Sequence, residues 1–463
     1  MIHLLHKSQN PRTGQVVGAE HLKLEEFLKN AFCDDVTSNH VAGILCAPLL
    51  SKEDILYRQE LVRVFYQNSV FLYAFVDVLG KMDVVYADWQ KVKKDYAMLT
   101  RSSQEPGYAQ WSYLKENVRY LLKIRQGILQ TEALLASLPK DSGEVFLPFV
   151  DFLKQALQLL DRYDVLLTAL SRGAYEHMDM SICIEINSMA EVLRLTMNTG
   201  GKKNVGRLLS EGNANLLFQE AIRHTNQVIL LINEGFFRFF HRCGEEILFY
   251  RFAVRYMKLL EDTCIPYVFP AIEDDRKMLA ANFYDPFLVA QGRTNRIVPR
   301  QISMEQEQSV ILTGDNNTGK TFYLRSLAYL QLFAQAGLPV GAKVARVGVR
   351  ENIYILFAGK EGGQSRRDMG LFEMDVMALA PIVHSVQPGD LVLLNEVFQA
   401  TFYDEAALAL YPILEYFRKK HAQFFLVTHI ESLLSHYTGE EVLLLQAGED
   451  FVVREKTVSM RSQ

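Results

Sequence analysis

The sequence predicts an all-α domain with long helices, followed by an α/β domain that contains a glycine-rich loop. In the first part, apolar residues recur three and four positions apart, and no proline occurs between Pro148 and Pro266. After Pro266 the pattern changes to short β-branched or leucine-rich runs that alternate with helical segments. Such alternation is typical of a parallel sheet covered by helices on both faces.

Residues 1–40 carry weak structural signals, so we expect a poorly defined segment there, a helical domain over residues 41–265 and an α/β domain over residues 266–463. Ser51-Lys52-Glu53-Asp54 resembles a capping box and predicts a helix that runs toward Leu79. The apolar spacing between Phe149 and Leu160 predicts another helix.

The last helical stretch, Asn213 to Leu260, is predicted to form one long helix, or two in line that meet near Gly235 or Gly244. Unbroken, it would extend roughly 70 Å at about 1.5 Å per residue. Its aromatic residues form either an interaction surface or, as their size favours, a packed core. They are Phe236, Phe237, Phe239, Phe240, Phe249, Tyr250 and Phe252.

In the α/β domain we predict five parallel strands from the short apolar runs. They cover Val310 to Thr313, Ile353 to Phe357, Leu391 to Leu394, Phe424 to Thr428 and Val442 to Leu445. A helical pattern from Phe322 to Ala336 follows the first strand and is ended by Gly337 and Pro339.

The glycine-rich loop after the first strand has the spacing G-x-x-x-x-G-K-T. Loops of this kind close their backbone N–H groups around phosphate oxygens at the start of a helix, where the helix dipole also favours negative charge. We therefore predict that the loop binds ATP, that Lys320 reaches the β- and γ-phosphates, and that the Thr321 hydroxyl holds Mg²⁺. The predicted nucleotide-binding residues are Gly314, Asp315, Asn316, Asn317, Thr318, Gly319, Lys320, Thr321 and Phe322.

Polar residues also end two later strands, where open α/β sheets bind their ligands. Asn395 and Glu396 follow the strand that begins at Leu391. We predict that Glu396 orients and deprotonates the attacking water, and that Asn395 accepts a hydrogen bond from water on Mg²⁺. The other interpretation is a strand end that merely meets solvent. His429 ends the next strand; it is either a second catalytic residue or a hydrogen-bonded histidine without a reactive role.

Taken in order, these motifs resemble the ATPase domain of the MutS family of DNA mismatch repair proteins, a branch of the ABC ATPases. The family pattern T-G-P-N-M-G-G-K-S-T-Y-x-R is similar to Thr313–Arg325, its L-L-D-E-I-G-R-G-T to Leu393–Thr401, and its A-T-H to Val427–His429. Upstream, Leu45–Leu50 with Ile55, Arg58 and Val62 resembles the start of the family's helical core and lever domain. The resemblance implies a P-loop ATPase domain of ABC/MutS type behind a lever domain.

Several positions depart from the family pattern. Asn395 stands where the family has aspartate, which removes one negative charge near Mg²⁺ and implies slow turnover. Asp368 stands where the family's signature serine, five residues before Glu373, reaches the nucleotide of the partner subunit. The position of the family's adenine-stacking aromatic aligns with Arg296, whose planar guanidinium is suited to stacking.

Other departures concern whole domains. Residues 1–40 are too few for the family's mismatch-reading and connector domains, and few residues follow His429 for its C-terminal helix-turn-helix. We therefore expect no mismatch recognition of the usual kind, and a homodimer that depends on nucleotide. If Asp368 repels phosphate, the neighbouring Ser365, Arg366 or Arg367 is expected to serve instead; the two arginines are otherwise a solvated pair.

Composition restricts the setting of the protein. With 49 basic and 54 acidic residues, the chain has no global positive field for nucleic acid or anionic membrane. The five cysteines lack C-x-x-C spacing, which favours reduced, buried thiols over disulfides or zinc ligands. No run of 18 apolar residues occurs, and the N-terminus lacks a signal-peptide pattern. The sequence thus predicts a cytoplasmic protein without membrane contact.

Two functional hypotheses follow from these observations. In the first, two copies sandwich ATP between their α/β domains, and the helical levers move on duplex or branched DNA during repair. The loop Gly200–Arg207 is then the candidate DNA contact, although a basic turn of this kind is also compatible with simple solvation. In the second, a catalytically weakened ATP sensor switches a protein–protein interface.

Overall fold

The computed structural model describes residues 3–8, 10–31, 35–102, 106–161, 214–292, 298–358, 370–437 and 439–456. The chain divides into two compact units, one formed by His3–Gln67 with Leu248–Gln463 and the other by Asn68–Ile247. These units have different boundaries from the domains expected from sequence. Residues 41–67, which the sequence pattern grouped with the helical half, belong to the unit that contains the α/β sheet.

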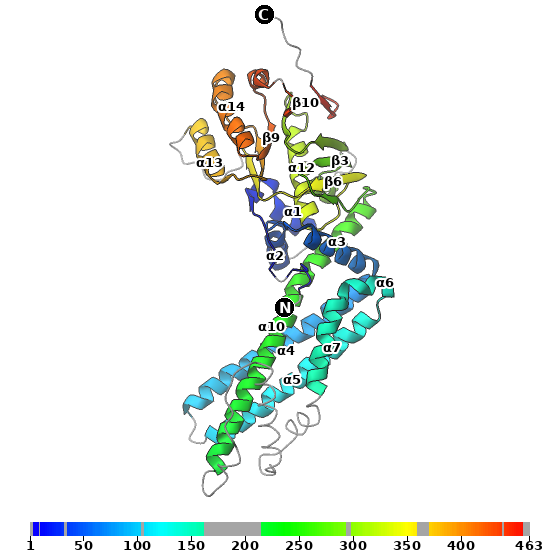
Figure 1. The fold of residues 1–463 in the computed structure, drawn as a ribbon, viewed down its shortest axis with the longest axis vertical. Helices are drawn as coiled ribbons and strands as arrows, with labels where there is room; N and C mark the ends of the chain where they lie inside the picture. Colours follow the sequence, from blue (N-terminus) through cyan, green and yellow to red (C-terminus); the bar gives the residue numbers. More distant parts are fainter. Residues whose placement is uncertain are drawn as a thin grey trace, which may run out of the picture. The chain divides into compact units, whose positions relative to one another are not determined.

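The helical unit is built from α4 (Ser69–Ser102), α5 (Pro106–Ala136), α6 (Lys140–Gly143), α7 (Leu147–Asp161) and the first part of α10 (Ala214–Asp262), all visible in Figure 1. Trp89 joins three of these helices, because its ring packs on Phe237 at 5.1 Å and its indole N–H donates to Asn117 Oδ1 at 3.0 Å. Asn233 Nδ2 in turn donates to the Asn117 carbonyl at 2.9 Å. Buried amides thus fix the register of an apolar bundle.

The predicted helices of the first half are present, but the helix expected from Ser51 is shorter than predicted. α10 is a single helix of 49 residues that includes both Gly235 and Gly244. Its aromatic residues are core, since six of the seven are buried and Phe236 is half-buried. The helix expected from Ser51 to Leu79 is instead α3 (Lys52–Gln67), and α4 starts after Asn68.

The main sheet of the other unit has the strand order β1-β7-β8-β9-β5-β10-β11. Its strands are β1 (Val16–Val17), β5 (Ser309–Gly314), β7 (Ile353–Phe357), β8 (Leu391–Asn395), β9 (Gln423–Val427), β10 (Val442–Ala447) and β11 (Val453–Glu455). All neighbouring strands are parallel except β10 and β11. The five predicted strands are confirmed, each within two residues of its expected ends.

Helices cover both faces of this sheet, as expected. Alternate strand residues such as Val392 and Phe424 share one core with α13 (Leu371–Ser385), α14 (Tyr403–Lys419) and the 3₁₀ helix η6 (Glu431–His436). Residues of the opposite parity face α12 (Lys320–Gln335), where Tyr323 packs on Phe425 at 5.7 Å.

A second sheet, which the sequence pattern did not predict, has the order β2-β6-β3-β4. It consists of β2 (Ala271–Glu273), β3 (Met278–Phe283), β4 (Arg300–Met304) and β6 (Val344–Gly348), and the short helix α11 (Pro286–Ala290) follows β3.

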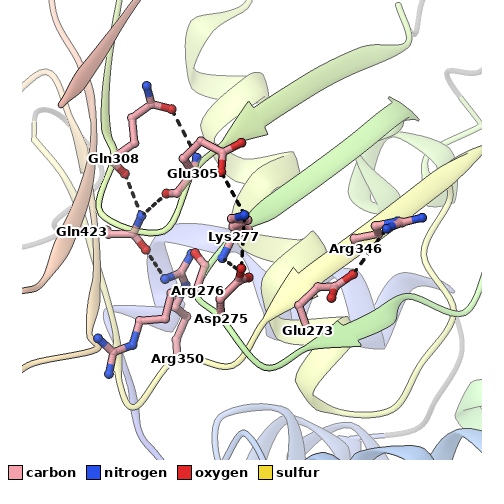
Figure 2. A network of polar contacts seen from close by, with 9 residues as sticks. All are labelled: Glu273, Asp275, Arg276, Lys277, Glu305, Gln308, Arg346, Arg350 and Gln423. Carbon is pink, nitrogen blue, oxygen red and sulfur yellow. Dashed lines mark hydrogen bonds and ion pairs between the residues drawn. The ribbon is translucent and has the colours of Figure 1, made fainter. Parts of the chain in front are cut away.

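A polar network at the amino end of β9, shown in Figure 2, joins the second sheet to the first. Arg350 is fully buried and donates to the Gln423 side chain and to the Arg276 carbonyl. Gln423 Nε2 donates to the carbonyls of Glu305 and Gln308, at 2.9 and 2.7 Å. Burial lowers the pKa of Arg350 to about 9. Both sheets therefore depend on one desolvated set of hydrogen bonds.

The N-terminal segment is better ordered than its sequence suggested, because it is part of this unit. β1 pairs in parallel with Ile353 and Tyr354 of β7. The 3₁₀ helix η1 (Ala19–Leu22), α1 (Leu24–Ala31) and α2 (Asp35–Leu45) follow. Phe27 is buried among aromatic rings, and the Tyr329 hydroxyl donates to the Leu22 carbonyl at 3.0 Å.

Two expectations from composition have a structural counterpart. Among the described residues, no helix is both long and apolar enough to cross a bilayer. Cys243 is buried and Cys46 half-buried, but Cys264 is exposed, which corrects the expectation that the thiols are buried. Cys33 and Cys183 lie outside the described residues.

The contact of the N-terminal segment with β7 yields a prediction. At Gly18, which has φ 83°, an added Cβ would lie 1.9 Å from the Ile355 carbonyl oxygen. We expect Gly18→Ala to lower the free energy of unfolding by about 1 to 2 kcal/mol through the left-handed backbone alone, and further through the clash.

The measurement is denaturant unfolding of both Gly18→Ala and a control. Gly43→Ala is the control, since Gly43 is inside helix α2 and nothing lies within 4 Å of an added Cβ. It is expected to gain about 0.5 to 1 kcal/mol. Equal stability of the two variants would contradict the role assigned to the Gly18 contact.

Candidate nucleotide site

The glycine-rich loop connects β5 to α12 and requires both glycines of its G-x-x-x-x-G-K-T pattern, Gly314 and Gly319. Gly314 has φ 139°, and a Cβ there would lie 2.6 Å from the Ala447 carbonyl oxygen. Gly319 has φ 80° and precedes the first helical residue, Lys320. Asn317 is also left-handed, with φ 64°. The local backbone is therefore held in conformations that most side chains disfavour.

The loop lines a pocket of about 980 Å³. Of the predicted nucleotide residues, Asn316, Asn317, Thr318, Gly319, Lys320, Thr321 and Phe322 line it, together with Glu396. Gly314 and Asp315 hold the base of the loop, where Lys320 Nζ donates to their carbonyls at 2.8 and 2.7 Å. Burial lowers the pKa of the Lys320 ammonium, while the carboxylates of Glu396 and Asp315 oppose that shift.

This arrangement fits a polyphosphate. Lys320 is 5% exposed as a whole residue, and its ammonium donates to neutral carbonyls. A phosphate oxygen in the pocket would add the opposite charge that the carbonyls lack. A helix N-terminus with tight glycine turns supplies the backbone amides that such a ligand requires.

The two residues predicted to serve a metal are in contact. Thr321 Oγ1 donates a hydrogen bond to Asn395 Oδ1 at 3.3 Å, from the first turn of α12 to the end of β8. Hydroxyl and amide oxygens are hard ligands of the type that suits Mg²⁺. Both residues also line a neighbouring pocket of about 740 Å³, which Glu396 shares.

The structure also brings Glu396 and His429 together. His429 Nε2 lies 3.3 Å from Glu396 Oε1. The approach does not have hydrogen-bond geometry, so this buried nitrogen has no hydrogen-bond partner among the described residues. An unpartnered nitrogen beside a carboxylate is suited to hold a water or a phosphate oxygen.

The turn that carries Glu396 is strained. Glu396 and Phe398 have φ values of 60° and 64°, each at a cost of about 1 to 2 kcal/mol for a residue with a side chain. The Glu396 N–H donates to the Val427 carbonyl at 2.8 Å, and the Phe398 N–H donates to Asp375 Oδ2 at 2.8 Å. Strain of this kind is often found at functional sites.

Sequence reasoning missed five residues of the 980 Å³ pocket: Leu288, Gly292, Val298, Arg300 and Phe451. Arg300 is the first residue of β4 and bonds Ser326. Phe451 lies in the turn between β10 and β11, is 47% exposed, and has φ 61°. Its ring would be 3.3 Å from a Cβ at Gly319. Only the order Gly-Glu-Asp-Phe hinted at a turn there.

Several predicted residues lie outside the described residues: Arg296, Ser365, Arg366, Arg367, Asp368 and the loop Gly200–Arg207. Glu373, the expected signature glutamate, is exposed in the first turn of α13.

Helix α13 carries an exposed apolar face, which we call the α13 face. It is formed by Leu371, Phe372, Val376 and Met377, with exposed fractions of 63%, 39%, 42% and 53%. Leu371 and Phe372 lie one turn before Asp375 on the same helix. Asp375 accepts a hydrogen bond from the turn that carries Glu396. Apolar surface gathered on one helix is a common mark of a protein interface.

Known proteins match part of this chain. The family model of MutS domain V matches residues 310–451. The chain is 27% identical over 197 residues to the DNA mismatch repair protein MutS of Prochlorococcus marinus, covering 40% of this chain and 21% of the relative. Human DNA mismatch repair protein Msh3 is 27% identical over 197 residues, covering 40% and 17%. Endonuclease MutS2 of Lactobacillus acidophilus is 28% identical over 166 residues, covering 35% and 20%.

These matches span about a fifth of the length of the curated relatives. The family-model match includes the glycine-rich loop, the end of β8 and His429, while the pocket residues Leu288, Gly292, Val298 and Arg300 lie before it. Residues 310–451 match MutS domain V, so this part of the chain is related to the MutS proteins.

Proposed function

We propose that the protein binds and slowly hydrolyses ATP, and that it uses the nucleotide to control an association with DNA in a repair-related process in the cytoplasm. One observation supports this proposal above others. The glycine-rich loop, the Thr321–Asn395 contact and the Glu396–His429 pair meet at the carboxyl end of one parallel sheet, within a MutS domain V.

Each group has a role in the proposed reaction. Lys320 would leave its two loop carbonyls and bind the β- and γ-phosphates, and the loop amides would hold the remaining oxygens. Glu396 would orient the attacking water and accept its proton, since it lines the same pocket. His429 would bind the water or the γ-phosphate through Nε2, which has no hydrogen-bond partner among the described residues.

Thr321 and Asn395 would hold Mg²⁺ and its waters. The ion would neutralise negative charge on the phosphate oxygens. Asn395 is neutral, so this chain offers the ion one carboxylate fewer than an aspartate at the same position would. Weak Mg²⁺ binding and slow turnover follow from that difference.

We further propose that two copies close on ATP through the α13 face. This face projects apolar side chains on the helix whose residue Asp375 binds the catalytic turn. Covering it with a second copy would remove exposed apolar area, which stabilises association by about 25 cal/mol per Å² before the cost of immobilisation.

The DNA part of the proposal rests on the relatives, which are named DNA mismatch repair proteins and an endonuclease. The net charge of −5 means that any DNA contact must be local. The helical unit with α4, α5 and α10 is the proposed lever, and the loop Gly200–Arg207 remains the candidate contact.

The alternative is an ATP-sensing scaffold that switches a protein interface with little hydrolysis. Asn395 favours it, because a neutral residue at the metal supports nucleotide binding better than it supports chemistry. Stimulation of turnover by DNA separates the two proposals.

The first test measures ATP binding and turnover with and without duplex or branched DNA. Wild type is expected to turn over ATP slowly and faster with DNA. Its DNA affinity is expected to fall with salt, by a log–log slope of about 0.9 per phosphate contacted. Lys320→Ala should weaken ATP binding at least tenfold, while the exposed control Lys343→Ala should not.

Glu396→Gln should retain ATP but lose turnover, because the amide cannot accept the proton. ATP binding without turnover in wild type would favour the scaffold. Unchanged ATP binding in Lys320→Ala would refute the nucleotide site itself.

The second test restores the missing charge with Asn395→Asp. A unit charge about 4 Å from the ion contributes roughly 1 to 4 kcal/mol, depending on screening. We expect the Mg²⁺ concentration for half-maximal turnover to fall about tenfold and kcat to rise severalfold. A titration of turnover against Mg²⁺ checks this; identical curves for the two proteins would show that residue 395 is not near the ion.

The third test concerns the dimer. Val376→Glu and Met377→Glu place a charge on the α13 face and should weaken dimerisation with a slowly hydrolysed ATP analogue at least tenfold. Leu408→Glu, at a 70% exposed position on α14, is the control and should leave dimerisation unchanged. Native mass measurement with and without the analogue provides the result. If wild type is a monomer with and without the analogue, the proposed closing of two copies on ATP is wrong.

A further inference from the structure

We propose that Asp375 is a positioning residue that holds Glu396 in its reactive place and links it to the α13 face. This inference rests on the proposed function, because it assigns Asp375 a role in the same hydrolysis. Asp375 is not among the residues that line the pocket of the glycine-rich loop; we propose that it acts through the backbone of the turn that follows Glu396.

The contact is specific. Asp375 Oδ2 accepts a hydrogen bond of 2.8 Å from the Phe398 N–H, two residues after Glu396. Phe398 is 1% exposed, so its N–H needs a partner inside the protein. Because Phe398 has φ 64°, the bond is made by a residue in a strained conformation. A carboxylate acceptor compensates for part of that strain.

A ring contact adds to this connection between α13 and the turn. The ring of Phe372, one turn before Asp375 on α13, packs on the ring of Phe398 with centroids 4.8 Å apart. Two side chains of one helix thus grip one residue of the turn. On the opposite side the turn is anchored to the sheet, since the Glu396 N–H donates to the Val427 carbonyl.

The position of Glu396 is therefore set between a fixed strand and a helix. The strand, β9, lies in the middle of the sheet and its residues are buried. The helix carries Val376 and Met377, which are exposed and directly follow Asp375 in sequence. A second copy that covers the α13 face would press on the residues beside Asp375. The contacts of Asp375 and Phe372 with Phe398 then make the position of the Glu396 carboxylate depend on whether that copy is bound.

A pocket lies beside Asp375, so its hydrogen bond with Phe398 can be removed without collapse of the fold. Asp375, Glu396 and Gln399 line the same 740 Å³ space. If the carboxylate is deleted, water can enter and bind the Phe398 N–H, so the domain should remain folded while the turn loses its fixed geometry.

The experiment compares Asp375→Ala with Asp375→Asn in the full chain. Alanine removes the acceptor, whereas the asparagine amide oxygen can still accept the Phe398 N–H bond. We expect Asp375→Ala to lower kcat at least tenfold, while its affinity for a slowly hydrolysed ATP analogue stays within about twofold of wild type and its mass with the analogue equals that of wild type. Asp375→Asn should retain most of kcat. Asp375→Val, close in volume, replaces Asp375→Ala if the latter is unstable.

Asp390→Ala is the matched control. Asp390 is a buried carboxylate that, like the half-buried Asp375, accepts backbone N–H bonds, from Gln387 at 2.7 Å and Asn352 at 3.0 Å. It precedes β8, at the end of the strand away from Glu396. It should lower the thermal midpoint without changing kcat of the folded protein. Equal kcat losses in both alanine variants would mean that Asp375 is merely structural.

Other outcomes separate this inference from the proposed function. If Glu396→Gln loses turnover but Asp375→Ala keeps it, the positioning role is wrong and the proposed hydrolysis stands. If Asp375→Asn loses as much kcat as Asp375→Ala, the hydrogen bond is not what matters and the inference fails. If Glu396→Gln turns over ATP like wild type, there is no catalytic carboxylate to position, and both proposals fall together.

Discussion

The candidate site depends on the parallel register of β5, β8 and β9. Val427 is paired with Leu312 on one side and with Asn395 on the other, so three chain segments end at one level of the sheet. The glycine-rich loop, the Thr321–Asn395 contact and the Glu396–His429 pair each begin where one of these strands ends. Because parallel strands all point the same way, residues more than a hundred positions apart converge there without any further device.

Much of this convergence could be predicted from sequence, since short apolar runs bounded by polar residues identify buried parallel strands. The smaller sheet could not, because strands such as Met278–Phe283 and Arg300–Met304 mix polar with apolar residues. β1 has only two residues, and its pairing is decided by β7, far away in the chain. The break at Asn68 lacks the proline or glycine that would have marked it.

Within the site, the sequence indicated the residues that we propose to carry the chemistry, but not those that hold them in place. Thr321 with Asn395, and Glu396 with His429, could be anticipated from strand ends and loop spacing. Positive φ at Glu396, Phe398 and Phe451 could not, because all three have side chains that normally avoid that region. The bond from Phe398 to Asp375 joins a turn to a helix that precedes it, a pairing that local patterns do not encode.

The short pairing of β1 has a consequence for the edge of the sheet. β7 is the last strand of full length on that side, and the N-terminal segment occupies its open backbone groups. A shortened protein starting after Val17 would leave a hydrophobic strand with unpaired N–H and C=O groups facing solvent, which is a template for self-association. Val16 and Val17 thus cover a sheet edge that would otherwise favour self-association, at a distance along the chain from every residue of the candidate site.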